Sequence, residues 1–148
     1  MNNWLSNPSF LVYAITCLVL CVNLLFLWGY SGAARAKTKT AINEEAALRF
    51  GASLAEMDPP TVARVLRAHH NAQASIYPFL FLGLVFVLAG GTAGTATVIF
   101  GIFTGARLLH SFFYLAGKQP WRTIFFSVGG LATIALMLAI IWLMIKGA

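Results

Sequence analysis

Hydrophobic residues fall into four long runs along this chain, and short polar segments separate the runs. The runs cover about 10–30, 61–88, 95–115 and 124–145. A helix needs roughly 20 residues to cross about 30 Å of hydrocarbon, and every run reaches that length. The pattern therefore predicts an all-α fold, an integral membrane four-helix bundle that occupies residues 1–148 as a single domain.

The composition supports this class, because 59% of the 148 residues are hydrophobic and only 9% are charged. The net charge of +6 does not indicate nucleic-acid binding, since the basic residues are spread among apolar runs instead of gathered on one soluble face. We therefore expect membrane lipids as partners and no nucleic acid. Cys17 and Cys21 have no further His or Cys nearby, so we expect packing residues and no metal site.

The polar segments after the first and third runs carry helix-capping residues and much of the Lys and Arg. Asn43 is expected to begin a short helix that Gly51 ends, and Asp58 is expected to cap the second long helix. The positive-inside rule places these two segments in the cytoplasm and both termini on the opposite side of a multi-pass protein. The sequence does not distinguish a bacterial inner membrane from the endoplasmic reticulum.

Positive and negative charges are unevenly placed. All four acidic residues lie within 44–58, whereas Arg64, Arg67, Arg107, Lys118, Arg122 and Lys146 follow without any acidic side chain. A buried guanidinium stays charged and needs water, a carbonyl, another subunit or a bound anion. The imbalance indicates a pocket for an anionic ligand.

The third run carries a polar stripe. Arg107, His110, Ser111 and Tyr114 follow one another at i, i+3, i+4 and i+7, which places them on one helical face. Such a stripe can be a polar seam that joins helices through hydrogen bonds, or it can line a site. Four polar residues together favour a site, because an intramembrane arginine is a functional candidate by default.

The second and fourth runs add further candidates. Arg67, Asn71 and Ala74 share a face with Arg64, and His70 lies beside it, so this face can meet the stripe of the third run. We expect Arg64 to contact lipid phosphates, whereas Arg67 has a structural and a ligand-binding interpretation. Arg122 and Thr123 begin the fourth run, where free amides favour an anion and a cation favours a thiolate. The alternative for Arg122 is contact with lipid headgroups.

Two sequence runs and four spaced residues closely resemble the MAPEG family of membrane glutathione-dependent enzymes, in its microsomal prostaglandin E synthase and glutathione transferase branch. They are Arg67-Ala68-His69-His70-Asn71, Ile76-Tyr77-Pro78-Phe79-Leu80, and Arg107, His110, Tyr114 and Arg122. The resemblance implies a homotrimer with glutathione as cofactor, bound between subunits near the cytoplasmic side. It implies that glutathione contacts Arg35, Arg67, His70, Asn71, Arg107, His110, Tyr114 and Arg122. It also implies that Arg122, Thr123 and Tyr114 are catalytic.

Three positions depart from the family pattern. Ala74 and Ala46 stand where acidic residues are usual, and His70 replaces a basic residue. These departures weaken an isomerase function of the prostaglandin synthase type and leave thiolate formation possible. We therefore expect a transferase or peroxidase that directs the glutathione thiolate at an apolar electrophile or lipid hydroperoxide. The alternatives are a non-catalytic lipid-binding scaffold of the same fold and the isomerase itself.

Overall fold

The structure is a computed structural model, and it describes residues 4–147. Its elements are a short 3-10 helix η1 (Trp4–Ser6), α1 (Pro8–Thr38), β1 (Thr40–Ala41), α2 (Glu44–Phe50), β2 (Ser53–Leu54), α3 (Pro60–Leu88), α4 (Ala93–Leu115) and α5 (Trp121–Gly147). The helices α1, α3, α4 and α5 have 31, 29, 23 and 27 residues and are apolar enough to cross a membrane. The predicted four-helix membrane bundle is confirmed.

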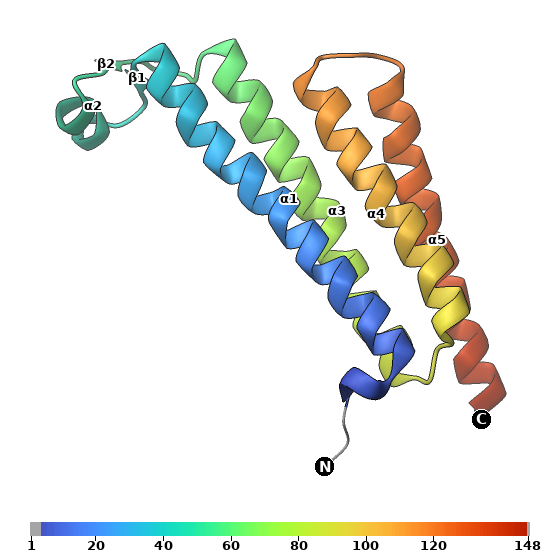
Figure 1. Cartoon of the computed structure of the whole chain (residues 1–148). Helices are drawn as coiled ribbons and strands as arrows, with labels where there is room; N and C mark the ends of the chain where they lie inside the picture. The colour runs from blue at the N-terminus through green and yellow to red at the C-terminus, as the bar shows by residue number, and fades with distance from the viewer. Residues whose placement is uncertain (1–3, 148) are drawn as a thin grey trace.

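The four long helices run up and down beside one another (Figure 1). α1 packs against α3 and α4, and α4 packs against α5. One end of the bundle carries the loop that contains α2 and the connection between α4 and α5, and we call it the loop end. The opposite end holds the turn between α3 and α4 and both chain termini (Figure 1).

Aromatic rings and one polar contact join the helices in the middle of the bundle. The rings of Phe79 and Phe103 stack with centroids 3.6 Å apart, and Phe100 meets Phe79 edge-on at 5.5 Å. Across α1 and α4, the Asn23 amide nitrogen donates to Ser111 Oγ over 3.1 Å. In lipid the hydrophobic effect does not draw helices together, so close packing and interhelical hydrogen bonds of this kind hold the bundle.

Helix capping in the loop follows the sequence at one helix and departs from it at the next. Asn43 accepts a hydrogen bond from the Ala46 amide at the start of α2, and Gly51 ends that helix in a left-handed conformation, as predicted. The prediction that Asp58 caps α3 is wrong, because α3 begins after Pro59 without a side-chain cap. The Asp58 carboxylate instead accepts two hydrogen bonds from Arg35, each of 3.1 Å. Paired, charge-assisted bonds outcompete a cap where Pro60 offers no amide.

α1 continues eight residues past the predicted span, from 30 to Thr38. Its last turn carries Arg35, which reaches across to the residue pair before α3. The two short strands lie parallel, with Thr40 opposite Ser53 and Ala41 opposite Leu54. These contacts tie the loop back to the loop end of α1.

Candidate functional site

The polar stripe of α4 lies inside the bundle. Arg107, His110 and Ser111 are 2%, 3% and 4% exposed, and Tyr114 is 9% exposed. The sequence prediction that these four residues share one face is confirmed by this common burial. The stripe runs from the middle of the bundle towards the loop end, where Tyr114 is the last of the four.

Arg107 is held without a carboxylate. Its Nη2 donates to the backbone oxygen of Phe126 over 3.2 Å, and its guanidinium carbon lies 5.5 and 5.3 Å from the ring centres of Phe103 and Phe126. Gly129 on α5 leaves the space, since a Cβ there would lie 2.5 Å from Nη2. Nε and Nη1 have no partner among the described atoms. Arg107 therefore braces α4 against α5 and keeps unused donors.

His110 links the stripe to the start of α5. Its Nδ1 lies 2.9 Å from the backbone oxygen of Arg122. A carbonyl oxygen only accepts, so Nδ1 carries the proton in this contact. Nε2 is then an acceptor in neutral His110, and it is buried without a partner in the part of the chain that the structure describes. The imidazole thus holds the backbone of Arg122 in place through this hydrogen bond.

Four residues at the loop end form a cluster around Arg122, which we call the Arg122 cluster: Tyr114, Gln119, Arg122 and Thr123. The Arg122 guanidinium carbon lies 4.7 Å from the centre of the Tyr114 ring. The orientation of the Gln119 amide is assigned from its neighbours. With its oxygen turned to Arg122, that oxygen lies 2.8 Å from Nη2 and 3.2 Å from Nε, and the amide nitrogen lies 3.0 Å from Thr123 Oγ1. The opposite orientation turns the amide nitrogen to the guanidinium, donor against donor, and keeps only the bond from Thr123 Oγ1 to the Gln119 oxygen.

Sequence analysis missed Gln119. Its spacing from Arg122 and Thr123, at i+3 and i+4, was the available signal, because residues at these separations can meet on one helical face. The adjacent Pro120 instead marked Gln119 as part of a break between helices. The structure shows that its side chain nevertheless reaches the first turn of α5.

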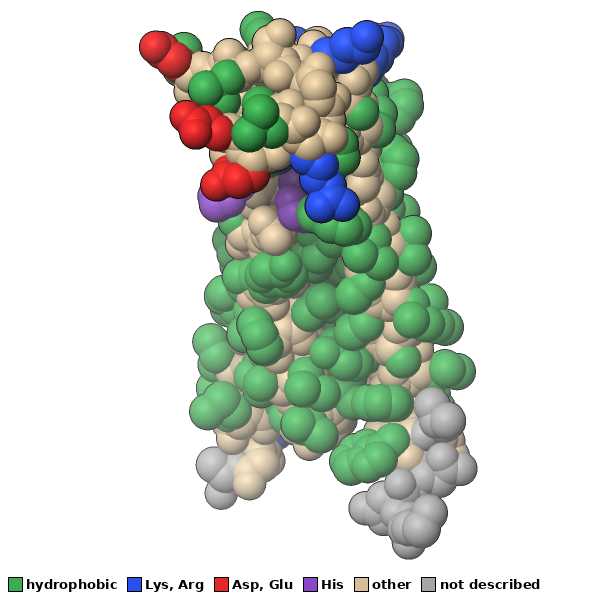
Figure 2. Space-filling model, turned by 90° about the vertical axis from the view of Figure 1, so that its left-hand side faces the viewer, with side chains coloured by type: hydrophobic (Ala, Val, Ile, Leu, Met, Phe, Trp, Pro, Cys, Tyr) green, Lys and Arg blue, Asp and Glu red, His purple; other side chains and the backbone are tan. Residues whose placement is uncertain are grey.

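The candidates on α3 lie towards the outside of the chain. Arg67 and His70 are exposed, and Asn71 is partly buried. The sequence allowed this face to meet the α4 stripe, and within one chain no hydrogen bond or ion pair joins the two groups among the described residues. Figure 2 shows histidine side chains below the projecting loop on the outer face of the molecule. The polar face of α3 is therefore open to whatever lies beside the chain.

Arg64 does not lie free at the start of α3. Its Nη1 sits 2.7 Å from the position that a Cβ on Gly117 would take, so its guanidinium covers the connection between α4 and α5. Gly117 has a φ of +67°, which a side chain would also disfavour. We expected Arg64 to contact lipid phosphates, and the structure adds a contact of its guanidinium with Gly117 in the same chain.

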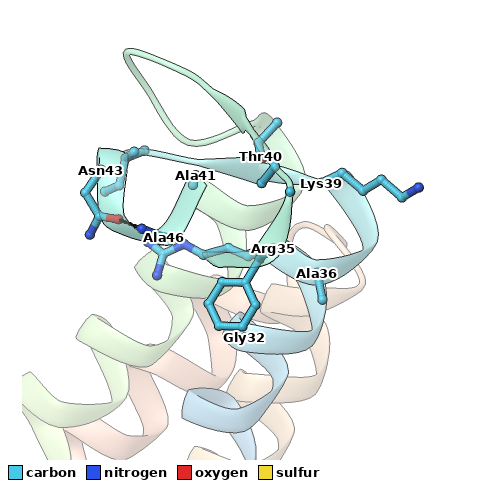
Figure 3. Close-up of a pocket in the computed structure, with 12 residues that line it drawn as sticks. Gly32, Arg35, Ala36, Lys39, Thr40, Ala41, Asn43 and Ala46 are labelled. Carbon is cyan, nitrogen blue, oxygen red and sulfur yellow. Dashed lines mark hydrogen bonds between the residues drawn. The ribbon is translucent and has the colours of Figure 1, made fainter. Parts of the chain in front are cut away.

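Arg35 lies at a separate cavity of about 620 Å³ between the end of α1 and the loop. Figure 3 shows its side chain pointing towards Asn43 and Ala46, whereas Lys39 points away. The lining residues come from α1, α2 and the residues around them, and none from α3, α4 or α5 lines it in the described chain. One chain therefore does not bring Arg35 to the Arg122 cluster.

The charge imbalance expected from the sequence persists in space. Within residues 4–147, the pair of Arg35 and Asp58 is the sole salt bridge. Neither Arg67 nor Arg122 therefore has a carboxylate partner in the part of the chain that the structure describes. No three His, Cys, Asp or Glu side chains of the same range lie close enough to hold a metal ion. The arrangement fits an organic anion that needs several cationic and neutral donors.

Comparisons with known proteins cover nearly the whole chain. A family model described as MAPEG family matches residues 13–142, a range that includes every candidate residue. A prostaglandin E synthase of Equus caballus is 36% identical over 135 residues, 87% of this chain and 88% of the relative. The prostaglandin E synthase of Homo sapiens is 31% identical over 139 residues, 93% and 91% of the two chains. A microsomal glutathione S-transferase 1 of Rattus norvegicus is 31% identical over 134 residues, 87% and 86%.

Proposed function

The chain belongs to the MAPEG family, and from this membership we propose that it is a membrane-bound, glutathione-dependent transferase or peroxidase. The substrate is an apolar electrophile or a lipid hydroperoxide that enters from the bilayer. The observation that carries the proposal is the Arg122 cluster, in which a guanidinium without a carboxylate partner lies beside a hydroxyl and an aromatic face.

The residues present fit glutathione in most respects. Its carboxylates match cations that have no acidic partner in the described chain, such as Arg67, and this leaves the Arg122 charge for the sulfur. His70 and Asn71 add polar groups on the same exposed side of α3. Its ammonium group is less well served, because Asp58 already pairs with Arg35 and Ala74 carries no acceptor. The acidic end of the tripeptide thus fits better than its amino group.

When bound, glutathione supplies a sulfur nucleophile. The Arg122 charge favours the ionised sulfur over the neutral thiol, since an opposite charge within about 4–6 Å stabilises an anion. Thr123 offers a hydroxyl donor one residue further along α5, and Tyr114 supports the guanidinium with its ring. No general base within the chain is needed, and fixed donors of this kind stabilise charge without rearranging.

A neighbouring copy completes the proposed site. The α3 candidates Arg67, His70 and Asn71 face outward in one chain, away from the buried stripe that leads to Arg122. We propose a homotrimer in which the α3 face of one subunit meets the Arg122 cluster of the next, with the site on the cytoplasmic side. Arg107 supports this site from inside the bundle, and Arg35 joins it if its bond to Asp58 opens.

One observation favours a second function, a lipid-binding scaffold without catalysis. Ala46 and Ala74 leave the cavity near Arg35 and the α3 face without carboxylates of their own. A protein that no longer bound the glutathione ammonium would tolerate both alanines. Isomerase activity on a cyclic lipid peroxide is the third and weakest candidate.

Thiolate formation tests the proposal. Purified protein mixed with glutathione should show the ultraviolet absorbance of a thiolate near neutral pH, and Arg122→Ala should lose it. Lys146→Ala is the matched control, because it removes a cation from the opposite end of α5, where the Lys146 Nζ lies 5.0 Å from the centre of the Trp142 ring. No thiolate absorbance with the unaltered protein, together with no glutathione binding by calorimetry, would favour the scaffold.

A further inference from the structure

Gln119 makes contacts with both polar residues of the first turn of α5. In the amide orientation assigned from its neighbours, its side-chain oxygen accepts from Arg122 Nη2 and Nε at 2.8 and 3.2 Å, and its side-chain nitrogen faces Thr123 Oγ1 at 3.0 Å. Two bonds to one guanidinium fix its plane as well as its position. Gln119 thus contacts the Arg122 guanidinium, which lies over the Tyr114 ring, whereas His110 binds the Arg122 backbone.

The direction of the second bond determines what Thr123 can do. With its oxygen turned to Arg122, Gln119 presents an amide N–H to Thr123 Oγ1, so the amide donates and the hydroxyl accepts. The hydroxyl hydrogen of Thr123 is then free to donate to another group. A carboxylate in place of the amide would reverse this, because it could only accept the Thr123 hydrogen.

The neutrality of Gln119 has a second effect. A glutamate here would bind Arg122 at least as firmly, since charge-assisted hydrogen bonds are stronger than neutral ones. It would also offset the guanidinium charge at about 3 Å, and a bound anion would gain less from Arg122. A carboxylate at residue 119 would hold Arg122 firmly but weaken the effect of its charge on a bound anion. The neutral amide of Gln119 holds Arg122 and leaves that charge available.

We propose that Gln119 is a positioning residue for thiol activation, and that it acts as a neutral clamp which orients Arg122 and leaves the Thr123 hydroxyl hydrogen available to the glutathione sulfur. This inference rests on the proposed function and adds a residue that the sequence did not single out. Gln119→Glu distinguishes this role from a purely structural one. If Gln119 only held Arg122 in place, glutamate would leave thiolate formation unchanged, whereas a role that needs a neutral side chain predicts a loss.

The experiment compares Gln119→Glu, Gln119→Ala and Asn7→Asp in the purified full-length protein. The readout is thiolate absorbance of added glutathione across a pH series, with thermal unfolding as the check on folding. Asn7→Asp is the matched control: it makes the same amide-to-carboxylate change at the cap of α1, at the opposite end of the bundle, where aspartate caps equally well.

Gln119→Glu is expected to raise the pKa of the bound thiol by roughly one unit or more, which means about tenfold less thiolate at pH 7, without lowered thermal stability. Gln119→Ala should raise it less, and Asn7→Asp should match the unaltered protein. A thiol pKa in Gln119→Glu equal to that of the unaltered protein would overturn this inference alone. A missing thiolate in the unaltered protein would overturn the proposed function together with the inference.

Discussion

The guanidinium carbon of Arg122 lies 4.7 Å from the centre of the Tyr114 ring, so the cation at the start of α5 rests on an aromatic face at the end of α4. A cation over a ring is worth about 0.5–2 kcal/mol, depending on how far it is removed from water. This contact joins the two helices at the loop end and fixes where the arginine lies.

Replacing Tyr114 separates the contribution of its ring from that of its hydroxyl. Tyr114→Phe keeps the aromatic face and should retain thiolate formation within about threefold, whereas Tyr114→Leu should reduce it by roughly 3–30-fold, the equivalent of the lost cation–π contact. Thiolate absorbance at fixed glutathione concentration measures both. Equal losses in the two variants would mean that the phenol hydroxyl, and not the ring, is what matters.

Gly129 sets the space for Arg107. A Cβ there would lie 2.5 Å from Arg107 Nη2 and 2.8 Å from Nε, so Gly129→Ala should overpack the interface of α4 and α5 and cost about 1–3 kcal/mol. Thermal unfolding in detergent measures the loss. At the neighbouring Gly130 a Cβ would meet no other atom within 4 Å, so Gly130→Ala should be neutral or slightly stabilising. Equal melting temperatures for the two variants would contradict the packing argument.

The hydrogen bond between Asn23 and Ser111 joins α1 to α4 within the bundle. A double-mutant cycle with Asn23→Leu and Ser111→Ala should give a coupling energy of about 0.5–2 kcal/mol, the range for polar contacts between membrane helices. Unfolding free energies of the two single variants and the double variant supply the cycle. Strictly additive losses would show that the pair adds nothing beyond packing.

The pair of Arg35 and Asp58 ties the end of α1 to the residue before the prolines of α3. Its side chains are 37% and 16% exposed, so Asp58→Asn should cost roughly 0.5–1 kcal/mol at low salt and almost nothing at high salt. Salt-dependent thermal unfolding measures this. Glu56→Gln is the matched control on the same loop, because Glu56 forms no salt bridge among the described residues. A salt-independent loss would indicate a packing effect.

Periodicity was sufficient for most of the fold. Four apolar runs gave the four long helices, and the i, i+3, i+4, i+7 spacing on α4 placed Arg107 and Tyr114 on one buried face. The caps at Asn43 and Gly51 were equally readable, because each depends on a single residue and its immediate neighbours. Local rules predict local structure well.

Contacts between distant segments were beyond those rules. Asp58 satisfied a local rule for capping, but Arg35 lies 23 residues away and binds the carboxylate more strongly. The contact of Gln119 with Arg122 was missed for a related reason. The proline that follows Gln119 predicts a break in the helix, but it does not predict where the Gln119 side chain points. In the trimer that we propose, the α3 candidates meet a neighbouring subunit, and no pattern within one chain describes such a contact.

The charge of Arg107 is supported by a carbonyl oxygen and two aromatic rings, none of which takes up a proton or competes with dissolved ions in mild conditions. Acid and salt weaken an ion pair on the loop by neutralising or screening its carboxylate. Among the described residues, Arg107 has no carboxylate partner that acid could neutralise or salt could screen. We therefore expect the contact of Arg107 between α4 and α5 to persist at acidic pH and at high salt, where the ion pair on the loop is lost.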